Sequence, residues 1–118
     1  MDFEGLERLA AASRTRMLYV CNPHNPVGRV WTRNELERLA DICRRNGVLV
    51  VSDEIHADIT FPGHRYTPFA SLGEADTQNS IICISPAKSF NIAACCSSFT
   101  VIADDARRKA FQAENSRL

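Results

Sequence analysis

The stretch SIICISPAKSFNI, residues 80–92, decides the fold. Its apolar and largely β-branched beginning, residues 80–84, predicts a buried strand. Ser85-Pro86-Ala87 ends that strand and Lys88 follows, so we expect the lysine amine at the edge of a sheet, where open α/β folds bind ligands. A lysine shielded from water there can lose its proton and act as a nucleophile. Most lysines behind a strand are instead solvated surface residues, so the upstream residues decide between the two.

Two further apolar runs, over residues 17–21 and 48–51, predict buried strands on either side of a helix. The helix begins with a capping box, in which Thr32 is the N-cap and Glu35 reaches back to it, and Gly47 follows the helix end as a left-handed residue. Strand, helix and strand with short connections form a right-handed βαβ unit. The sequence therefore predicts the α/β class, with a mostly parallel sheet covered by helices.

The rest of the chain carries weaker patterns. Helical spacing and N-cap residues predict a helix near each end. The expected elements are a helix over residues 2–12, a loop over 59–78 with one helical turn at 68–72, a connector over 89–94, a strand over 97–102, and a helix that runs from Asp104-Asp105 to the C-terminus. In the loop, His64, Arg65 and Tyr66 either reach a ligand or are plain exposed residues.

The composition is that of a soluble globular protein, with 118 residues, 45% of them hydrophobic, and 14 basic and 14 acidic side chains. A formal charge of zero without long runs of one sign gives no support for a nucleic-acid partner. No apolar stretch is long enough to span a bilayer, and the N-terminus has no apolar signal core. We therefore expect a cytoplasmic protein without a membrane partner.

The cysteine content also favours a cytoplasmic protein. Five of them without a CxxC pair predict reduced, mostly buried thiols and no metal site. The neighbouring pair Cys95-Cys96 has redox activity as its alternative, although a bond between neighbouring cysteines is strained.

Polar residues follow each of the three strands predicted to be parallel. Asn25 lies in the loop NPHNPVGR, residues 22–29, whose prolines and glycine exclude regular structure. Asp53 and His56 lie in SDEIHAD, residues 52–58, directly behind the second strand. The alternatives without a ligand are a tight strand-to-helix turn for the first loop and ordinary helix caps for the second.

Because these loops are expected at one edge of the sheet, Asn25, Asp53 with His56, and Lys88 are expected to converge there. An amide, a carboxylate and a lysine together suit pyridoxal 5'-phosphate. The lysine forms a Schiff base with the cofactor. The carboxylate holds a proton on the pyridine nitrogen, so that the ring acts as an electron sink, and the amide or a ring-nitrogen donor hydrogen-bonds the phenolic oxygen.

With the motifs NPHNPVGRVW, SDEIH and SPAKSFNIA, the chain resembles the class I/II aminotransferase superfamily of fold type I. Most members have tyrosine at the position of His56, and DEIHAD with KSFNIA looks most like the cystathionine β-lyase branch, the MalY/PatB type of carbon–sulfur lyase. The resemblance implies that Lys88 carries the Schiff base and shuttles the proton, and that Asp53 pairs with the pyridine nitrogen. It also implies that Asn25 and His56 contact the phenolic oxygen and that Ser85 binds the phosphate.

The sequence departs from the family in two ways. Many aminotransferases place a phosphate-binding arginine eight residues after the lysine, and here that residue is Cys96. Family enzymes are also several times longer, so residues 1–118 are expected to form a single partial domain, the central portion of the cofactor-binding large domain, with the small domain and the N-terminal part absent. Because relatives build each site from two subunits, a homo-oligomer is expected.

Three functions compete on this basis. The first is a carbon–sulfur β-lyase that cleaves a cysteine thioether such as cystathionine and releases thiol, pyruvate and ammonia. The second is an aminotransferase that uses the same residues; His56 and the small residue Cys96 argue against it. The third is a truncated, catalytically incompetent chain that keeps the family's sheet but does not seat the cofactor.

Overall fold

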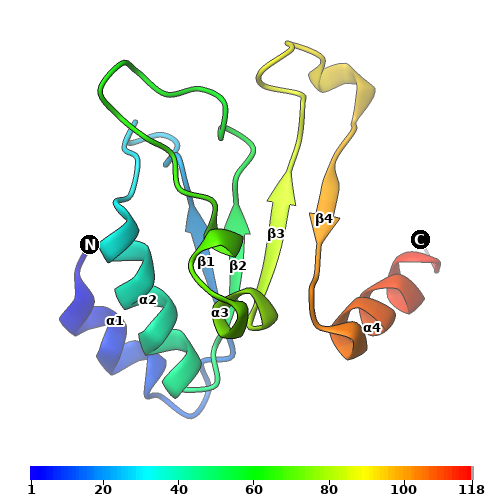
Figure 1. Cartoon of the computed structure of the whole chain (residues 1–118). Coiled ribbons are helices and arrows are strands. Elements are labelled where there is room, and N and C mark those ends of the chain that lie inside the picture. The colour runs from blue at the N-terminus through cyan, green and yellow to red at the C-terminus, as the bar shows by residue number, and fades with distance from the viewer. Residues whose placement is uncertain (118) are drawn as a thin grey trace.

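A four-stranded sheet forms the centre of the computed structural model, which describes residues 1–117. The strands follow one another across the sheet in chain order (Figure 1). They are β1 (Met17–Cys21), β2 (Leu49–Asp53), β3 (Ser80–Ile84) and β4 (Phe99–Val101). The first three strands are parallel and β4 is antiparallel to β3, which confirms the predicted α/β class with a mostly parallel sheet.

Four helices accompany the strands in the described residues: two lie in the connections between strands, one precedes β1 and one follows β4. They are α1 (Phe3–Ala10), α2 (Arg33–Arg45), α3 (Glu74–Gln78) and α4 (Asp105–Asn115), with short 3₁₀ turns η1 (Phe69–Ser71) and η2 (Ala93–Cys95). The structure differs from the expectation in two places. The short helix α3 lies in the segment expected as loop, and α4 ends at Asn115. Five residues are too few for a hydrophobic period to be visible, which is why α3 escaped notice.

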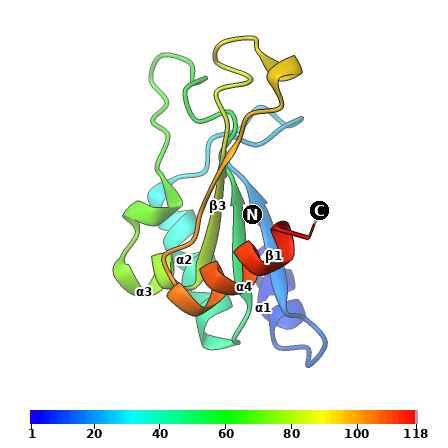
Figure 2. The same ribbon diagram turned by 90° about the vertical axis from the view of Figure 1, so that its right-hand side faces the viewer.

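The helices of the crossovers share one face of the sheet. Both crossovers, from β1 to β2 and from β2 to β3, move the chain in the same direction across the sheet, and right-handed connections of this kind bring their helices to the same side. Accordingly α2 packs on β2, α3 packs on β3, and the two helices touch each other; Figure 2 shows both to one side of the strands. On the opposite face the edge strand β1 is open, with Tyr19 74% exposed and Met17 44% exposed, whereas Val51 beside Tyr19 on β2 is 7% exposed.

The core lies between α2 and the sheet. The helix contributes five buried residues at helical spacing, and the sheet contributes the side chains that face it. The predicted capping box is present, since Thr32 accepts from the Glu35 N–H while the Glu35 carboxylate accepts from the Thr32 N–H. Gly47 follows with a φ of 65°, as expected for a left-handed residue after a helix end. The α2–β2 unit is therefore the best-specified part of the fold.

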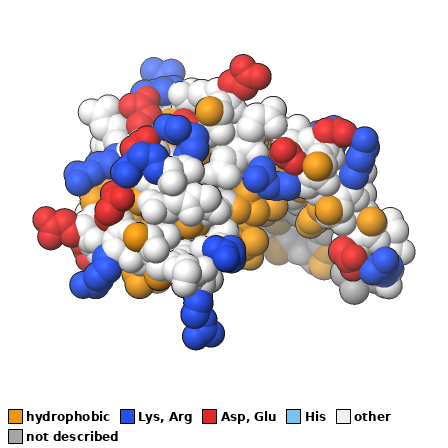
Figure 3. All heavy atoms as spheres, turned by 90° about the horizontal axis from the view of Figure 1, so that it is seen from below, with side chains coloured by type: hydrophobic (Ala, Val, Ile, Leu, Met, Phe, Trp, Pro, Cys, Tyr) orange, Lys and Arg blue, Asp and Glu red, His pale blue; other side chains and the backbone are white. Residues whose placement is uncertain are grey.

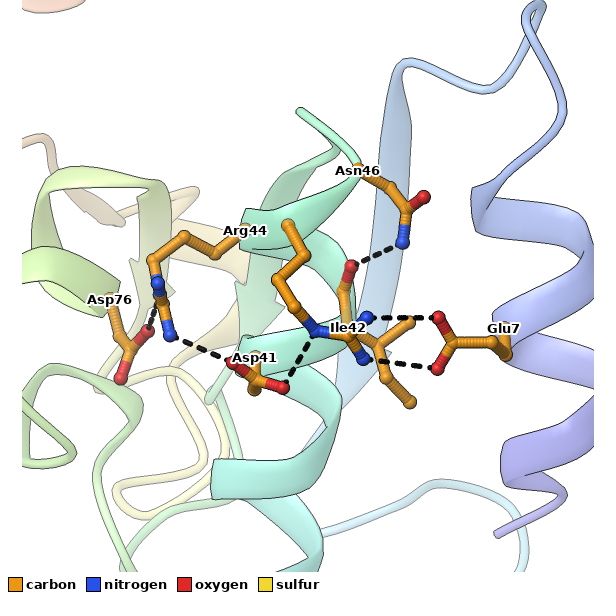
Figure 4. Close-up of polar contacts among 7 residues, drawn as sticks. Glu7, Asp41, Ile42, Arg44, Asn46 and Asp76 are labelled. Atoms are coloured by element: carbon orange, nitrogen blue, oxygen red, sulfur yellow. Dashed lines mark hydrogen bonds and ion pairs between the residues drawn. The ribbon is translucent and has the colours of Figure 1, made fainter.

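A chain of ion pairs joins the three N-terminal helices on the outer surface of α2 (Figure 4). Asp41 accepts from Arg44 at 2.8 Å and from Arg45 at 2.9 Å. Arg45 continues to Glu7 of α1 at 3.1 Å, and Arg44 continues to Asp76 of α3 at 3.3 Å. Single exposed pairs of this kind contribute about 0–1 kcal/mol each, so the network orients the helices more than it stabilises the fold.

The C-terminal part of the chain has much less contact with the rest. Each residue from 90 to 101 is exposed, and α4 buries none of its side chains. Seen from below, hydrophobic side chains are exposed between α4 and the other helices (Figure 3). No helix within residues 1–117 is long and apolar enough to cross a membrane.

Candidate active site

The ends of the three parallel strands lie level at one edge of the sheet. Asp53, the last residue of β2, pairs with Cys21 of β1 and Cys83 of β3. Backbone hydrogen bonds continue just past the strands. The Asn22 N–H donates to the Asp53 carbonyl at 2.9 Å, and the Glu54 N–H donates to the Cys83 carbonyl at 2.8 Å. The loops that carry Asn25, His56 and Lys88 therefore start from the same edge.

The asparagine loop is held by its first asparagine, Asn22, whose structural role the sequence did not indicate. Asn22 is 1% exposed; its amide nitrogen donates to the Thr67 carbonyl at 3.2 Å and its amide oxygen accepts from the Trp31 N–H at 3.1 Å. Asn25 is exposed and makes no side-chain hydrogen bond within residues 1–117. Asn22 is thus the structural residue, and Asn25 is the one free to meet a ligand.

The base of this loop is also rigid around Trp31. The indole N–H donates to the Cys21 carbonyl at 2.9 Å, the His24 ring stacks on the indole, and the Arg29 guanidinium lies 4.4 Å from the ring centre on the indole face. Stacking and cation–π contacts of this kind hold the loop in one conformation without using Asn25.

Asp53 is the last residue of β2, and His56 lies in the tight turn that follows it. Asp53 is half-buried, and its Oδ1 accepts from the Ile55 N–H at 3.2 Å, which leaves Oδ2 without a hydrogen bond among the described residues. His56 lies inside a turn closed by the Ala57 N–H, which donates to the Glu54 carbonyl at 3.0 Å. The Nδ1 of His56 is buried and has no partner in residues 1–117. Burial and then the Asp53 carboxylate raise the pKa of the Cys83 thiol, which therefore stays protonated beside the site.

Lys88 lies in the loop behind β3, next to the loop of Asp53. Ser89 donates to the Asp58 carboxylate at 2.7 Å, which ties the two loops together. Lys88 itself is exposed, and its ammonium has no ion pair or hydrogen bond in the described part of the chain. Ser85, at the base of the loop, accepts from the Ala87 N–H at 3.1 Å and donates to the Ser97 carbonyl at 2.6 Å.

Two hollows at this edge of the sheet are lined by different candidate residues. Asn25 and His56 line one cleft of about 530 Å³ between the asparagine loop and residues 56–64. Asp53 lines another cavity of about 340 Å³, together with His24, which also borders the first. Lys88 and Ser85 line neither of these two, so the structure brings Asn25 and His56 together and leaves the lysine on the adjoining loop.

Comparison with known proteins identifies the arrangement. Residues 1–113 match the family described as aminotransferase class I and II. This chain belongs to that family. Its enzymes depend on pyridoxal 5'-phosphate, and their mixed α/β, mostly parallel sheet is the one seen here.

The most similar relatives include both lyases and transaminases. Cystathionine β-lyase PatB of Bacillus subtilis (strain 168) is 44% identical over 117 residues, which are 99% of this chain and 30% of PatB. Kynurenine–oxoglutarate transaminase 3 of Rattus norvegicus is 39% identical over 61 residues, 52% of this chain and 13% of that protein. A PLP-bound crystal structure from Clostridium difficile 630 has a TM-score of 0.95 at 42% identity, covering 99% of this chain and 30% of that one. The chain thus spans less than a third of the length of these proteins.

The residues at the sheet edge fit the cofactor of this family. His56, whose Nδ1 is buried and unpartnered in the described residues, and Asn25, whose amide is free there, line the same cleft. Asp53 has a free Oδ2 and Lys88 an unpaired amine among the described residues, and these are the carboxylate and the amine that such a cofactor would need. Ser85 fits on one condition: since its single proton is directed at Ser97, its hydroxyl has to turn before it donates to a phosphate.

Proposed function

We propose that this chain carries the cofactor-binding centre of a pyridoxal-phosphate-dependent carbon–sulfur β-lyase. Its substrate is a cysteine thioether such as cystathionine, and its products are a thiol, pyruvate and ammonia. The observation that carries the proposal is the 44% identity to cystathionine β-lyase PatB along 117 residues, which include His56 and Lys88. The amino-acid chemistry of the family supports the substrate class.

The proposed roles follow from the atoms that are free. Lys88 would hold the cofactor covalently and would be the base that removes the substrate α-proton. Asp53 would accept a hydrogen bond from the pyridine nitrogen through Oδ2, Asn25 and His56 would bind the phenolic oxygen, and Ser85 would bind the phosphate. When bound, the cofactor supplies an electron sink for the pair of electrons left on the substrate α-carbon.

An aminotransferase with the same residues is the second candidate, because a kynurenine transaminase is among the relatives. The two reactions differ in what happens after the α-proton is removed: a lyase expels the β-thiolate, and a transaminase moves the proton and passes the amino group on. Product analysis distinguishes them. Pyruvate, ammonia and free thiol from cystathionine support the lyase, and a keto acid that still contains the thioether supports the transaminase.

We also propose that the protein works as a homo-oligomer. The sheet has an open face at β1, and the edges of β1 and β4 are unpaired within residues 1–117. Exposed strand edges and apolar faces tend to associate with other chains. Sedimentation of the purified chain should show association that depends on concentration; a monomer at all concentrations would count against it.

The test of the cofactor site uses the small number of lysines. The chain has Lys88 and Lys109 as its lysines, and Lys109 on α4 is 74% exposed and pairs with Asp105 at 2.7 Å. After incubation with pyridoxal phosphate and reduction with borohydride, mass spectrometry should locate the adduct on Lys88, and Lys109→Ala should label like the wild type. A cofactor analogue should compete for the Lys88 adduct.

Equal labelling of Lys88, Lys109 and the N-terminus would contradict the proposal for this chain. It would favour the catalytically incompetent alternative, in which the motifs are present and the pocket is not built. If Lys88 is labelled specifically, Lys88→Ala should abolish product formation. Asp53→Asn should then slow single-turnover product formation by several powers of ten, at about 1.4 kcal/mol of barrier per tenfold.

A further inference from the structure

Glu54, between Asp53 and His56, carries a carboxylate that is 3% exposed. No cation pairs with it in the described part of the chain. Three donors satisfy it instead: the Ser52 hydroxyl at 2.8 Å and the Phe69 N–H at 2.9 Å reach Oε1, and the Tyr66 hydroxyl reaches Oε2. A buried carboxylate is stable only when hydrogen bonds compensate for its lost hydration, so the fold needs all three contacts.

These donors come from two distant places in the chain. Ser52 is part of β2, whereas Tyr66 and Phe69 lie 12 and 15 residues beyond Glu54. Residues 58–65 between them are all exposed. The carboxylate therefore fastens the returning end of this exposed loop to the strand that ends in Asp53. Burial, and then the Glu54 carboxylate, raise the pKa of Tyr66, so its hydroxyl remains protonated and donates.

The backbone of Glu54 also defines the turn that presents His56. Its N–H donates to the Cys83 carbonyl of β3 at 2.8 Å, and its carbonyl accepts from Ala57 at 3.0 Å. Every polar group of Glu54 is thus engaged, and His56 lies two residues away inside the turn. A shift of the Glu54 side chain moves the base of this turn, and with it the imidazole of His56, which lines the cleft.

We propose that Glu54 is a positioning residue for the candidate active site, acting with Tyr66. The hydrogen bond between their side chains anchors residues 66–69 against β2 and so fixes His56, while Glu54 itself touches no ligand. The consequence for cofactor binding rests on the proposed function; the consequence for His56 does not.

The first measurement follows the His56 ring by NMR of ¹³C-labelled histidine, in the cofactor-free chain. The chain has three histidines, and the His56 signal is identified by its loss in His56→Asn. Tyr66→Phe keeps the ring and removes the hydroxyl, which leaves Oε2 of Glu54 buried without its donor. We expect the His56 signal to move and broaden, while His24, stacked on Trp31, keeps its signal. The matched control is Tyr19→Phe, at the 74% exposed tyrosine, which should change neither signal.

The second measurement is cleavage by trypsin after Arg65, which is exposed and directly precedes the anchored residues. The protease needs the residues after Arg65 to be free, so the rate reports how often this anchor opens. Tyr66→Phe should raise the cleavage rate about tenfold or more, equivalent to about 1.4 kcal/mol, and Tyr19→Phe should not. Glu54→Ala should have a larger effect than Tyr66→Phe. Glu54→Gln should restore much of the wild-type behaviour, because its oxygen accepts from Ser52 and Phe69 and its amide donates to Tyr66.

The outcomes separate positioning from a general contribution to stability. A lower melting temperature of Tyr66→Phe with an unmoved His56 signal and an unchanged Arg65 cleavage rate would overturn the proposal. If Glu54→Ala does not fold, Tyr66→Phe and Glu54→Gln decide alone. Labelling of Lys88 by pyridoxal phosphate should fall in Tyr66→Phe and not in Tyr19→Phe. Absence of Lys88 labelling in the wild type would count against the proposed function, whereas the His56 and Arg65 results judge Glu54 independently.

Discussion

The α2–β2 unit and the segment from residue 90 to α4 both carry local helix and strand signals, and their structures are very different. Each contains a helix with an N-cap whose side chain accepts a backbone N–H, Thr32 in α2 and Asp104 in α4. Five residues of α2 are buried and none of α4. Local signals thus fix where a helix begins, and only an apolar partner makes it part of a core.

This difference matters for the candidate site because Lys88 lies at the boundary between the two regions. Asn25, Asp53 and His56 stand on loops anchored to the packed unit through buried groups such as Asn22 and Glu54. The Lys88 loop is fixed by the exposed contacts of Ser85 and Ser89. The α2–β2 unit therefore holds Asn25, Asp53 and His56 of the candidate site in place, whereas Lys88 lies on a loop with fewer contacts.

Cysteine reactivity should show the largest contrast between the regions. Burial raises the pKa of Cys43 in α2 to about 11, whereas Cys95 and Cys96 are exposed. Because only the thiolate reacts, roughly one Cys43 thiol in a thousand is ionised at about pH 8, and its burial slows reaction further. Iodoacetamide should modify Cys95 and Cys96 at least about a hundredfold faster than Cys43, as followed by peptide mass spectrometry. Comparable rates would mean that the α2 core opens readily.

A core deletion should destabilise one region and leave the other unaffected. Leu36 in α2 is fully buried, so Leu36→Ala should lower the free energy of unfolding by about 2–5 kcal/mol. The matched change in α4 is Phe111→Ala, at a side chain that is 44% exposed, and it should stay within about 0.5 kcal/mol. Urea unfolding followed by Trp31 fluorescence measures both. A cost of 2 kcal/mol or more for Phe111→Ala would reveal a contact of α4 that the described residues do not show.

Caps of the two helices provide a smaller version of the same comparison. Thr32→Ala should cost about 1 kcal/mol of unfolding free energy, because it removes the acceptor for the Glu35 N–H. Asp104→Ala removes the equivalent acceptor for the Arg107 N–H, yet α4 buries no side chain, so the urea midpoint should stay the same. The helical signal in circular dichroism should fall for Asp104→Ala without a change in that midpoint. A shift of the midpoint as large as that for Thr32→Ala would show that α4 is coupled to the core.

The strands, the α2 helix and its caps could be predicted because each depends on signals within a few residues. The apolar runs, the Thr32–Glu35 box and Gly47 all function locally, and the structure has them where the sequence indicates. The short helix α3 and the exposure of β4 could not be predicted in this way. Both depend on what the chain meets in space, and β4 reads as an ordinary strand although all three of its residues are exposed.

For the candidate site, the sequence indicated the loops that carry the polar residues. It did not indicate the buried residues Asn22 and Glu54, which anchor these loops. Asn25, Asp53, His56 and Lys88 were found because polar residues behind apolar strands stand out, and their roles remain proposals. Asn22 is an asparagine three positions before Asn25, and Glu54 is a carboxylate directly after Asp53. What distinguishes Asn22 and Glu54 is burial, together with hydrogen-bond partners 45 and 15 residues away in the chain. Tyr66, which the sequence left between a ligand contact and a plain exposed residue, turns out to bind Glu54.

The smallest expected effect is a dependence of stability on pH that belongs to the packed unit. The Thr32 N–H, which donates to Glu35 at 3.0 Å, lowers the pKa of that carboxyl below its ordinary value of 4.5, with the Thr32 hydroxyl and Arg29 adding to it. A lowered pKa in the folded state means that the ionised form stabilises the fold, so the contribution is complete above about pH 4.5 and is lost as the pH falls below it. Glu35→Gln should therefore flatten the fall of the urea midpoint between about pH 5 and pH 3 and should be mildly destabilising at pH 7. Glu114→Gln on α4 is the control and should leave the curve unchanged, because α4 buries no side chain. An equal flattening in both variants would assign the acid sensitivity to the overall charge and not to the cap of α2.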